Sequence, residues 1–184
     1  MHPLDNVIWK ALTTRQAQYA ECFDQACRFM PEVSPLAGFR EPTPEGYASL
    51  AGLLNTRGTV GLFLEVPYQA RAGWGLVAGA PMPEMVYEGS GDAGLRSADS
   101  RERLSPHRSD PEIVELGAED SPEMMALTAL TKPGPFNQRT HELGAYVGIR
   151  REGKLVAMAG ERLKIPGYTE VSAICTHPEH TGHG

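Results

Sequence analysis

The residues of this chain that most clearly suggest chemistry lie at 174–184, which read ICTHPEHTGHG. A run of strand-forming residues leads there into a proline, three histidines and two closely spaced glycines. A strand followed by glycine-rich backbone at a helix start can bind an anion, because free amides point outward and glycine lacks the Cβ that would hold a phosphate away. The stretch therefore has the features of the start of a phosphate-binding turn at its two closely spaced glycines, Gly182 and Gly184.

The same stretch also carries residue types that bind metal. Cys175, His177, His180 and His183 are all side chains that zinc accepts, and the histidines are spaced by three. Pro178 and the neighbouring glycines oppose a regular helix, however, and a structural zinc site normally takes ligands from two segments. We therefore expect no metal here, and we interpret Cys175 as a buried, inert thiol instead of a nucleophile.

The second half of the chain is predicted to form one helix and several strands that position this stretch. Ser121, Pro122 and Glu123 are a strong helix start, and Pro133 ends that helix. Turns that contain Gly153 and Gly167 join the later strands into an antiparallel meander. The predicted strands are residues 112–116, 145–150, 155–165 and 169–175.

The first half is predicted to begin with helices. Apolar residues spaced by three and four favour a helix over residues 13–30. Cys22 and Cys27 lie within it on different faces, so we expect two reduced thiols. Thr43 is a good N-cap and Pro44 suits the first helical position, which predicts a second helix. Two strands are predicted in this half, one at residues 59–66 and a second in the apolar stretch 74–80 and 82–87, which Pro81 and Pro83 interrupt.

The composition is that of a folded protein with a polar interruption. Of 184 residues, 41% are hydrophobic and 22% are charged, close to the average for globular proteins. A polar run rich in Gly, Ser, Asp and Arg cannot bury enough apolar surface to offset its ordering entropy. We predict an N-terminal α+β domain of unassigned role at 1–88, a linker at 89–110 and a second domain at 111–184.

Charge and hydropathy exclude two classes of partner. The net charge of −6 argues against a protein that coats nucleic acid, because that function needs a basic face. No run approaches the roughly 18 apolar residues of a membrane span, and the N-terminal residues lack the pattern of a signal peptide. We expect no nucleic-acid partner, no membrane partner and a cytoplasmic location.

Two stretches of the second half resemble a known family. VSAICTHPEH at 171–180 and the run TKPGPF to RTHELG at 131–144 are similar to the GNAT superfamily of acyl-CoA-dependent N-acyltransferases, and more closely to a bacterial two-domain subgroup. The resemblance covers about residues 110–184 and implies a GNAT-like α/β (mixed α+β) fold: a mixed, mainly antiparallel sheet flanked by helices. In that family the fourth strand leads into a motif whose glycines and amides hold the pyrophosphate of acetyl-CoA. Thr181 stands at the motif's Arg or Gln position and Gly184 at its first glycine, so we expect a chain truncated within the motif.

The resemblance also implies a reaction and the residues that perform it. It implies transfer of an acetyl group from the cosubstrate acetyl-CoA to a small-molecule or peptide amine, with the acceptor side of the cleft lined by the loop 132–142. Backbone near Ile174–Thr176 would stabilise the oxyanion, and Glu170 and Glu161, on neighbouring strands, are the candidate catalytic bases. The cofactor-binding residues that it implies are Ile174, Cys175, Thr176, Thr181, Gly182, His183 and Gly184.

Other interpretations stay open at this point. Glu161 and Glu170 are alternatively ordinary solvent-facing residues of half-exposed strands, where polar residues alternate with apolar ones. The whole chain is alternatively a non-catalytic acyl-CoA-binding or interaction module, or an inactive truncated remnant. The edge of the last predicted strand is apolar and unpaired, which allows a homodimer.

Overall fold

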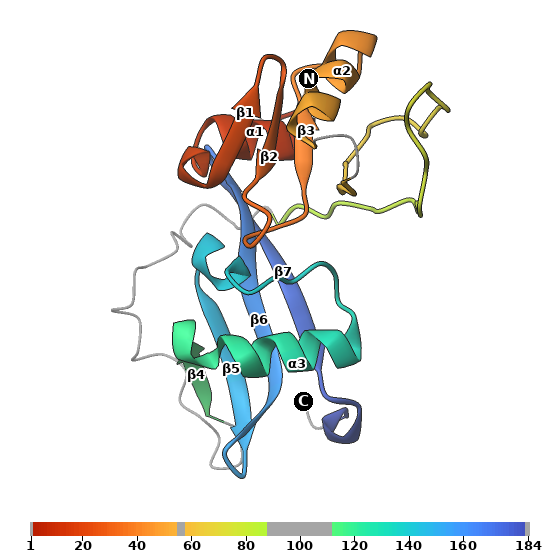
Figure 1. Ribbon diagram of the computed structural model, residues 1–184. Coiled ribbons are helices and arrows are strands. Elements are labelled where there is room, and N and C mark those ends of the chain that lie inside the picture. Colours follow the sequence, from red (N-terminus) through yellow and green to blue (C-terminus); the bar gives the residue numbers. More distant parts are fainter. Residues whose placement is uncertain (1, 55–57, 88–111, 183–184) are drawn as a thin grey trace. The chain divides into compact units, whose positions relative to one another are not determined.

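The computed structural model describes residues 2–54, 58–87 and 112–182 (Figure 1). Among these, residues 2–66 pack together with residues 112–182 in one compact unit, and residues 67–87 belong to a second. The predicted linker at 89–110 lies outside the described residues. The predicted division at 1–88, 89–110 and 111–184 stays a prediction, although residues from both proposed domains share the first unit.

A four-stranded antiparallel sheet forms the centre of the first unit. Its strands lie in the order β4-β5-β6-β7, so each strand pairs with its neighbour in the sequence and the predicted meander is confirmed. The strands are β4 (Ile113–Leu116), β5 (Tyr146–Arg151), β6 (Lys154–Ile165) and β7 (Tyr168–Thr176).

Two tight turns set the register of this sheet. Glu152 and Gly153 connect β5 to β6 with φ of 51° and 80°, the positive values that a two-residue hairpin turn of type I′ requires. Gly167 follows Pro166 with φ of 85°, which suits the third position of a type II turn whose second position is proline. Both turns lie where the sequence predicts them.

Helix α3 (Ser121–Thr131) crosses one face of the sheet (Figure 1). It begins at the predicted Ser-Pro-Glu start, and Lys132, in the left-handed conformation, ends it just before Pro133. The helix buries Met124 and Leu127 against the strands. The core between helix and sheet consists of Leu116, Met124, Leu127, Tyr146, Leu155, Met158, Ala173 and Cys175.

A second, three-stranded sheet and two helices make up the N-terminal part of the unit. The strands β1 (Ala20–Phe23), β2 (Ala26–Phe29) and β3 (Ala37–Phe39) are antiparallel in sequence order. Helix α1 is Val7–Thr13 and α2 is Pro44–Leu53. The hydroxyl of Thr43 accepts a hydrogen bond of 3.2 Å from Gly46 N–H, so the predicted cap of α2 is confirmed. Short 3₁₀ helices lie at Ala17–Tyr19, Ala118–Asp120, Thr140–Leu143 and Pro178–His180.

The predicted helix over residues 13–30 is wrong. Helix α1 ends at Thr13, and β1 and β2 form a hairpin. Asp24 turns the chain with φ of 49°, a conformation that aspartate tolerates better than most residues. A two-residue turn resets the phase of the side chains, so apolar residues spaced by three and four across it do not mark a helical face.

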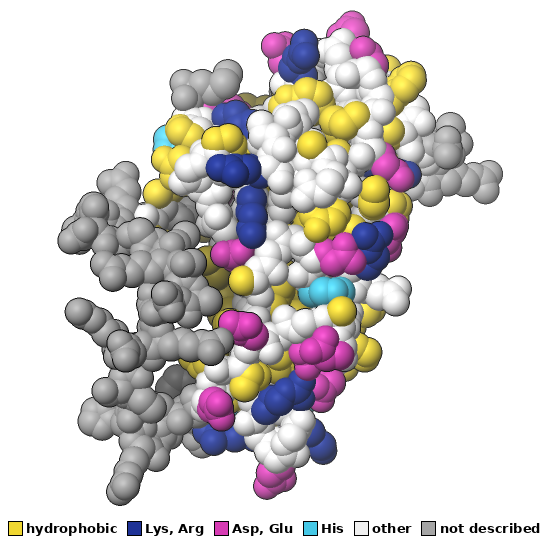
Figure 2. All heavy atoms as spheres, turned by 90° about the vertical axis from the view of Figure 1, so that its left-hand side faces the viewer, with side chains coloured by type: hydrophobic (Ala, Val, Ile, Leu, Met, Phe, Trp, Pro, Cys, Tyr) yellow, Lys and Arg dark blue, Asp and Glu magenta, His cyan; other side chains and the backbone are white. Residues whose placement is uncertain are grey.

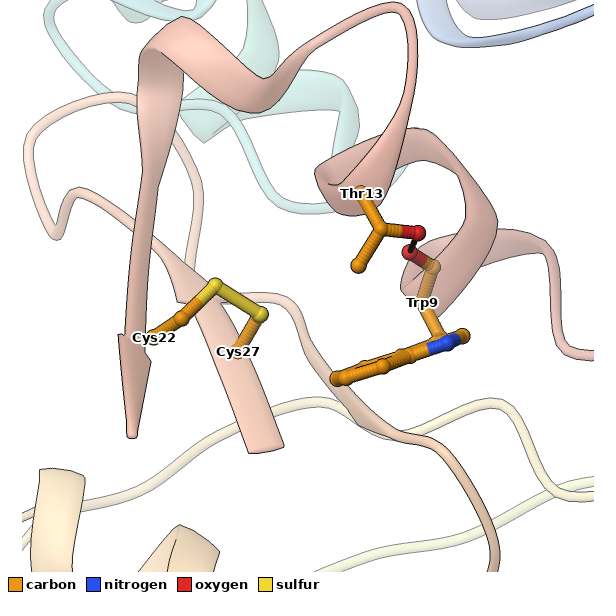
Figure 3. The surroundings of a disulfide bond; sticks show 4 residues. All are labelled: Trp9, Thr13, Cys22 and Cys27. Atoms are coloured by element: carbon orange, nitrogen blue, oxygen red, sulfur yellow. Dashed lines mark hydrogen bonds between the residues drawn. A yellow bond between two sulfur atoms is a disulfide. The ribbon is translucent and has the colours of Figure 1, made fainter. Parts of the chain in front are cut away.

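Cys22 and Cys27 are joined by a disulfide (Figure 3), which corrects the prediction of two reduced thiols. The two residues are directly opposite each other in the β1–β2 hairpin, and their Cα atoms lie 4.0 Å apart. The indole of Trp9, from α1, extends toward the bridge. A separation of five residues, which puts two side chains on different faces of a helix, places them side by side across this turn.

The strands predicted between 59 and 87 are also wrong. Residue Gly61 forms an isolated parallel bridge with Leu36, and the rest of 58–87 contains neither helix nor strand. Pro81 and Pro83 lack the backbone N–H donors that a paired strand needs, which explains why the later residues, 74–87, form no strand.

A shared core joins the N-terminal part to the large sheet. Ile8, Leu12 and Phe29 pack in one cluster with Leu163 and Ile165 of β6. Gln16 is 1% exposed, and its side-chain amide makes two hydrogen bonds to β6. Its nitrogen donates to the carbonyl of Arg162 at 2.8 Å, and its oxygen accepts from Lys164 N–H at 3.2 Å. Residues 2–66 and β6 are therefore one packed body.

One face of the molecule is shown in Figure 2 with its side chains coloured by type. Acidic and basic side chains are interspersed with hydrophobic ones on the face that Figure 2 presents. Among the described helices, none has the length and apolar character needed to cross a membrane.

Candidate acyl-transfer site

A β-bulge in β7 is the first feature of the site. Met158 pairs with Cys175 and Gly160 pairs with Ser172, so two residues of β7, Ala173 and Ile174, lie opposite one residue of β6. Ala173 adopts φ of 54°, as expected for a bulge that bends the strand. Such a bulge interrupts the ladder of hydrogen bonds and re-aims the backbone around it.

The bulge determines how the predicted site residues Ile174, Cys175 and Thr176 are oriented. Ile174 and Thr176 point outward, while Cys175 is buried against α3. Burial raises the pKa of the Cys175 thiol above its ordinary value, against opposing contributions from the Thr131 hydroxyl and the Met158 backbone. The thiol is therefore protonated at neutral pH, in agreement with its interpretation as an inert core residue.

The predicted phosphate turn follows β7 after the short 3₁₀ helix Pro178–His180. His177 N–H donates a hydrogen bond of 2.7 Å to the carbonyl of Val156, and the Thr181 hydroxyl donates one of 3.1 Å to the carbonyl of Pro178. These two bonds fix the backbone where it leaves the sheet. Gly182 has φ of 81°, and no atom of the described residues other than its chain neighbours lies within 4 Å of the position that its Cβ would take. His183 and Gly184 lie outside the described residues. Among the residues that are described, no cluster of three or more metal-binding side chains occurs.

Glu170, one of the two candidate bases, is held by Arg162. Its two oxygens accept from Arg162 Nε at 3.0 Å and Nη2 at 2.6 Å, a bidentate pair. The side chain of Arg162 is 9% exposed and that of Glu170 is 32% exposed. The pair therefore forms a largely buried, internally neutral group at the edge of the sheet.

Glu161, the other candidate, has different partners. Its carboxylate lies 2.8 Å from Lys164 Nζ and accepts from Ala145 N–H at 3.0 Å. Desolvation raises the pKa of Glu161, but the hydrogen bonds from Lys164 and Ala145 outweigh it and leave the pKa below its ordinary value. The two carboxylates are on neighbouring strands, as predicted, but the structure does not join them into one cluster.

Tyr146 is a feature that the sequence did not point to. Its side chain is buried, the residue being 3% exposed, and its hydroxyl has no hydrogen-bond partner among the described residues. Burial is the main cause that raises the pKa of Tyr146 to about 12; Glu170 and Glu161 also raise it, and Arg162 lowers it. The one available signal was Gly160 inside a strand, because such a glycine often marks a close approach.

A hollow of about 360 Å³ borders this region. It is lined by Met125, Thr128, Ala129, Lys132, Gly134 and Phe136, from α3 and the loop after it. The Phe136 ring contacts the Tyr146 ring edge to face, with centroids 5.7 Å apart. Farther along the predicted acceptor loop, Arg139 forms ion pairs with Glu32 and Glu142.

Comparison with solved structures finds a similar fold in the crystal structure of a protein from Novosphingobium aromaticivorans DSM 12444 that is assigned as a GNAT-family acetyltransferase. The TM-score is 0.71, the sequences are 30% identical, and the match covers 99% of this chain and 75% of that one. No protein-family model and no curated protein matches the sequence. The similarity confirms the predicted fold class and extends it to the first half of the chain, which the sequence did not connect with any family.

Proposed function

Because the chain belongs to the GNAT family, we propose that it is an N-acetyltransferase that transfers the acetyl group of acetyl-CoA to an amine. The observation that carries the proposal is the bulge at Ala173 and Ile174 near the end of β7, with a positive-φ glycine, Gly182, after the short 3₁₀ helix that follows the strand. The bulge re-aims backbone amides and the turn leaves space around Gly182, so one short segment offers places for both a thioester carbonyl and a phosphate.

The proposed reaction is a direct displacement. The amine nitrogen attacks the thioester carbonyl, a C–N bond forms, the C–S bond breaks, and the sulfur leaves as the thiol of CoA. Negative charge develops on the carbonyl oxygen between these events. A backbone N–H near Ile174–Thr176 donates to that oxygen, and its fixed position makes it effective because no reorganisation is needed.

The turn after β7 is proposed to hold the pyrophosphate. The amides of Thr181, Gly182, His183 and Gly184 are the donors that the sequence predicts, and anions favour such exposed amides. The space around Gly182 fits this role, since a side chain there would occupy the place of a phosphate.

The amine must also lose a proton, and Glu170 and Glu161 remain the candidates for this step. Both carboxylates already accept hydrogen bonds, from Arg162 and from Lys164 with Ala145. Because these donors already occupy the carboxylate oxygens, we propose that the proton reaches either carboxylate through water and not by direct contact.

Titration calorimetry with acetyl-CoA, together with an assay for release of the CoA thiol in the presence of amines, tests the proposal. Gly182→Asp places a negative charge in the turn and is expected to reduce the affinity for acetyl-CoA at least about tenfold, which corresponds to 1.4 kcal/mol. The matched control is Gly167→Asp, because Gly167 also has a positive φ (85°) and open space around it, but lies in a different turn.

Equal affinities for the two variants would show that the pyrophosphate does not bind at this turn. Binding of acetyl-CoA without turnover of any amine would instead support the alternative, a non-catalytic acyl-CoA-binding module. Self-association and a cytoplasmic location also remain part of the proposal, and light scattering of the purified chain tests the first.

A further inference from the structure

We propose that the Tyr146 hydroxyl and Arg162 Nη1 bind the carbonyl oxygen of an amide group, and that Tyr146 thereby selects an amide-bearing amine as the acyl acceptor. The assignment of this ligand as the acceptor rests on the proposed function. The existence of an amide-binding site does not.

The first observation is the unpaired hydroxyl of Tyr146. Buried polar groups nearly always have a hydrogen-bond partner, and each exception calls for an explanation. Tyr146 is 3% exposed, and its hydroxyl has no partner among the described residues. Since the pKa of Tyr146 is raised to about 12, the hydroxyl keeps its proton at neutral pH and is free to donate it.

The second observation is the unused side of Arg162. Glu170 occupies Nε and Nη2, and no hydrogen bond within the described residues involves Nη1. Nη1 is directed to the loop after α3, since it lies 3.9 Å from the Cβ position of Gly134. The guanidinium also lies 5.6 Å from the centre of the Phe63 ring, which holds it in place.

The two donors belong to one neighbourhood of the sheet. Tyr146 pairs with Gly160, and its ring lies so close over this glycine that a Cβ would fall 2.1 Å from Tyr146 Cε1. The ring therefore reaches across β6 toward β7. Arg162 follows Gly160 by two residues on β6 and is also buried, and its positive charge lies near enough to Tyr146 to lower the pKa of Tyr146.

The charges of the site favour a carbonyl oxygen over a carboxylate. The positive charge of Arg162 is already balanced by Glu170, so a bound anion would gain no net charge partner and would lie near the Glu170 carboxylate. A neutral oxygen with two lone pairs matches two free donors without this cost. An amide carbonyl is a strong neutral acceptor that is common in metabolites and peptides.

The hollow beside α3 adjoins the proposed site. Gly134 and Phe136 line the hollow, and the same two residues border Arg162 and Tyr146. Its volume of about 360 Å³ is enough for a small amide or the end of a peptide.

Binding of three matched amines, measured by NMR titration without acetyl-CoA, tests the inference. L-Alaninamide carries the carbonyl, isopropylamine replaces the carboxamide by a methyl group, and L-alanine replaces it by a carboxylate. We expect L-alaninamide to bind about tenfold more tightly than either of the others, and Tyr146→Phe to abolish this difference.

Tyr146→Phe removes the hydroxyl and keeps the ring, so the fold should persist with an unchanged or higher melting temperature. The control is Tyr19→Phe, because the Tyr19 hydroxyl donates to the Glu142 carbonyl at 2.8 Å and takes no part in the proposed site. Tyr19→Phe should retain the preference for L-alaninamide.

Equal binding of L-alaninamide and isopropylamine, a preference that survives in Tyr146→Phe, or tighter binding of L-alanine would each overturn the inference. The result is independent of the proposed function, because acetyl-CoA is absent. A preference lost in Tyr146→Phe, in a protein that does not bind acetyl-CoA, would retain the amide site and reject the acetyltransferase.

Discussion

At the scale of single residues, the site is characterised by charges that are already paired and one hydroxyl that is not. Glu170 is bound to Arg162 and Glu161 to Lys164, so neither carboxylate stands free in a cleft. Tyr146 is buried without a partner. A buried polar group without a partner indicates a functional role more strongly than an ion pair does, because the partner of a charged residue already accounts for its position.

The lowered pKa of Glu161 makes stability depend on pH. A carboxylate whose pKa is lower in the folded state stabilises the protein above its unfolded pKa, about 4.3, and loses that contribution as the pH falls through the folded value. Glu161→Gln should therefore lower the free energy of unfolding at pH 7 and flatten its decline in acid. Denaturant unfolding between pH 7 and pH 3 measures both effects.

The control for this experiment is Glu112→Gln, since Glu112 is exposed and precedes β4. An acid decline of Glu161→Gln as steep as that of Glu112→Gln would show that the hydrogen bonds from Lys164 and Ala145 contribute nothing to stability.

At the scale of elements, the β1–β2 hairpin is closed by the disulfide and by its own short turn. The bridge confines only the segment from Cys22 to Cys27, so the entropy that it removes from the unfolded chain is modest. Cys175 is the remaining cysteine and is buried.

Reduction of the disulfide should lower the free energy of unfolding by about 2 kcal/mol, because the unfolded hairpin regains its freedom. Thiol titration in denaturant should find one thiol per chain before reduction and three after it, since the chain has three cysteines and Cys175 is free. Cys22→Ser with Cys27→Ser provides the matched variant, whose stability should not respond to reductant.

Three thiols in the protein as extracted from cells would contradict the bridge and would agree with the predicted cytoplasmic location, where thiols stay reduced. One thiol would support the bridge and oppose that location.

At the scale of the whole described chain, the N-terminal residues stabilise the sheet that carries the site. Gln16 satisfies the Arg162 carbonyl and the Lys164 amide of β6. Strand β5 begins at Tyr146, opposite Gly160, and therefore does not extend far enough to pair with these two backbone groups.

Gln16→Leu should therefore cost about 2–3 kcal/mol, since it leaves two buried backbone groups without a partner. We expect the loss in one cooperative transition, with faster hydrogen exchange in β6 as well as in α1. Gln18→Leu is the control, because Gln18 is exposed two residues away. Separate transitions for residues 2–66 and 112–182 would show that the two parts do not form one folding unit.

The sequence by itself determined the meander, α3, α2 and the family. Each of these depends on local signals: Pro and Gly at turns, a Ser-Pro-Glu helix start, a Thr-Pro cap and the run VSAICTHPEH, whose meaning does not change with the surroundings. The same local reasoning failed at residues 13–30, because apolar residues three and four apart fit a helix or a hairpin equally until the turn at Asp24 is known.

Only the tertiary structure decided which side chains meet. The Cys22–Cys27 bridge depends on a hairpin register, the Arg162–Glu170 pair on a shift between β6 and β7, and the position of Tyr146 on the glycine opposite it. Register and bulges are set by packing over the whole sheet, where a shift of one residue moves a side chain to the other face. For this reason both glutamates could be predicted from the sequence, but their ion-pair partners could not. Tyr146 could not be predicted either, because its significance lies in a buried hydroxyl that has no hydrogen-bond partner in the described fold.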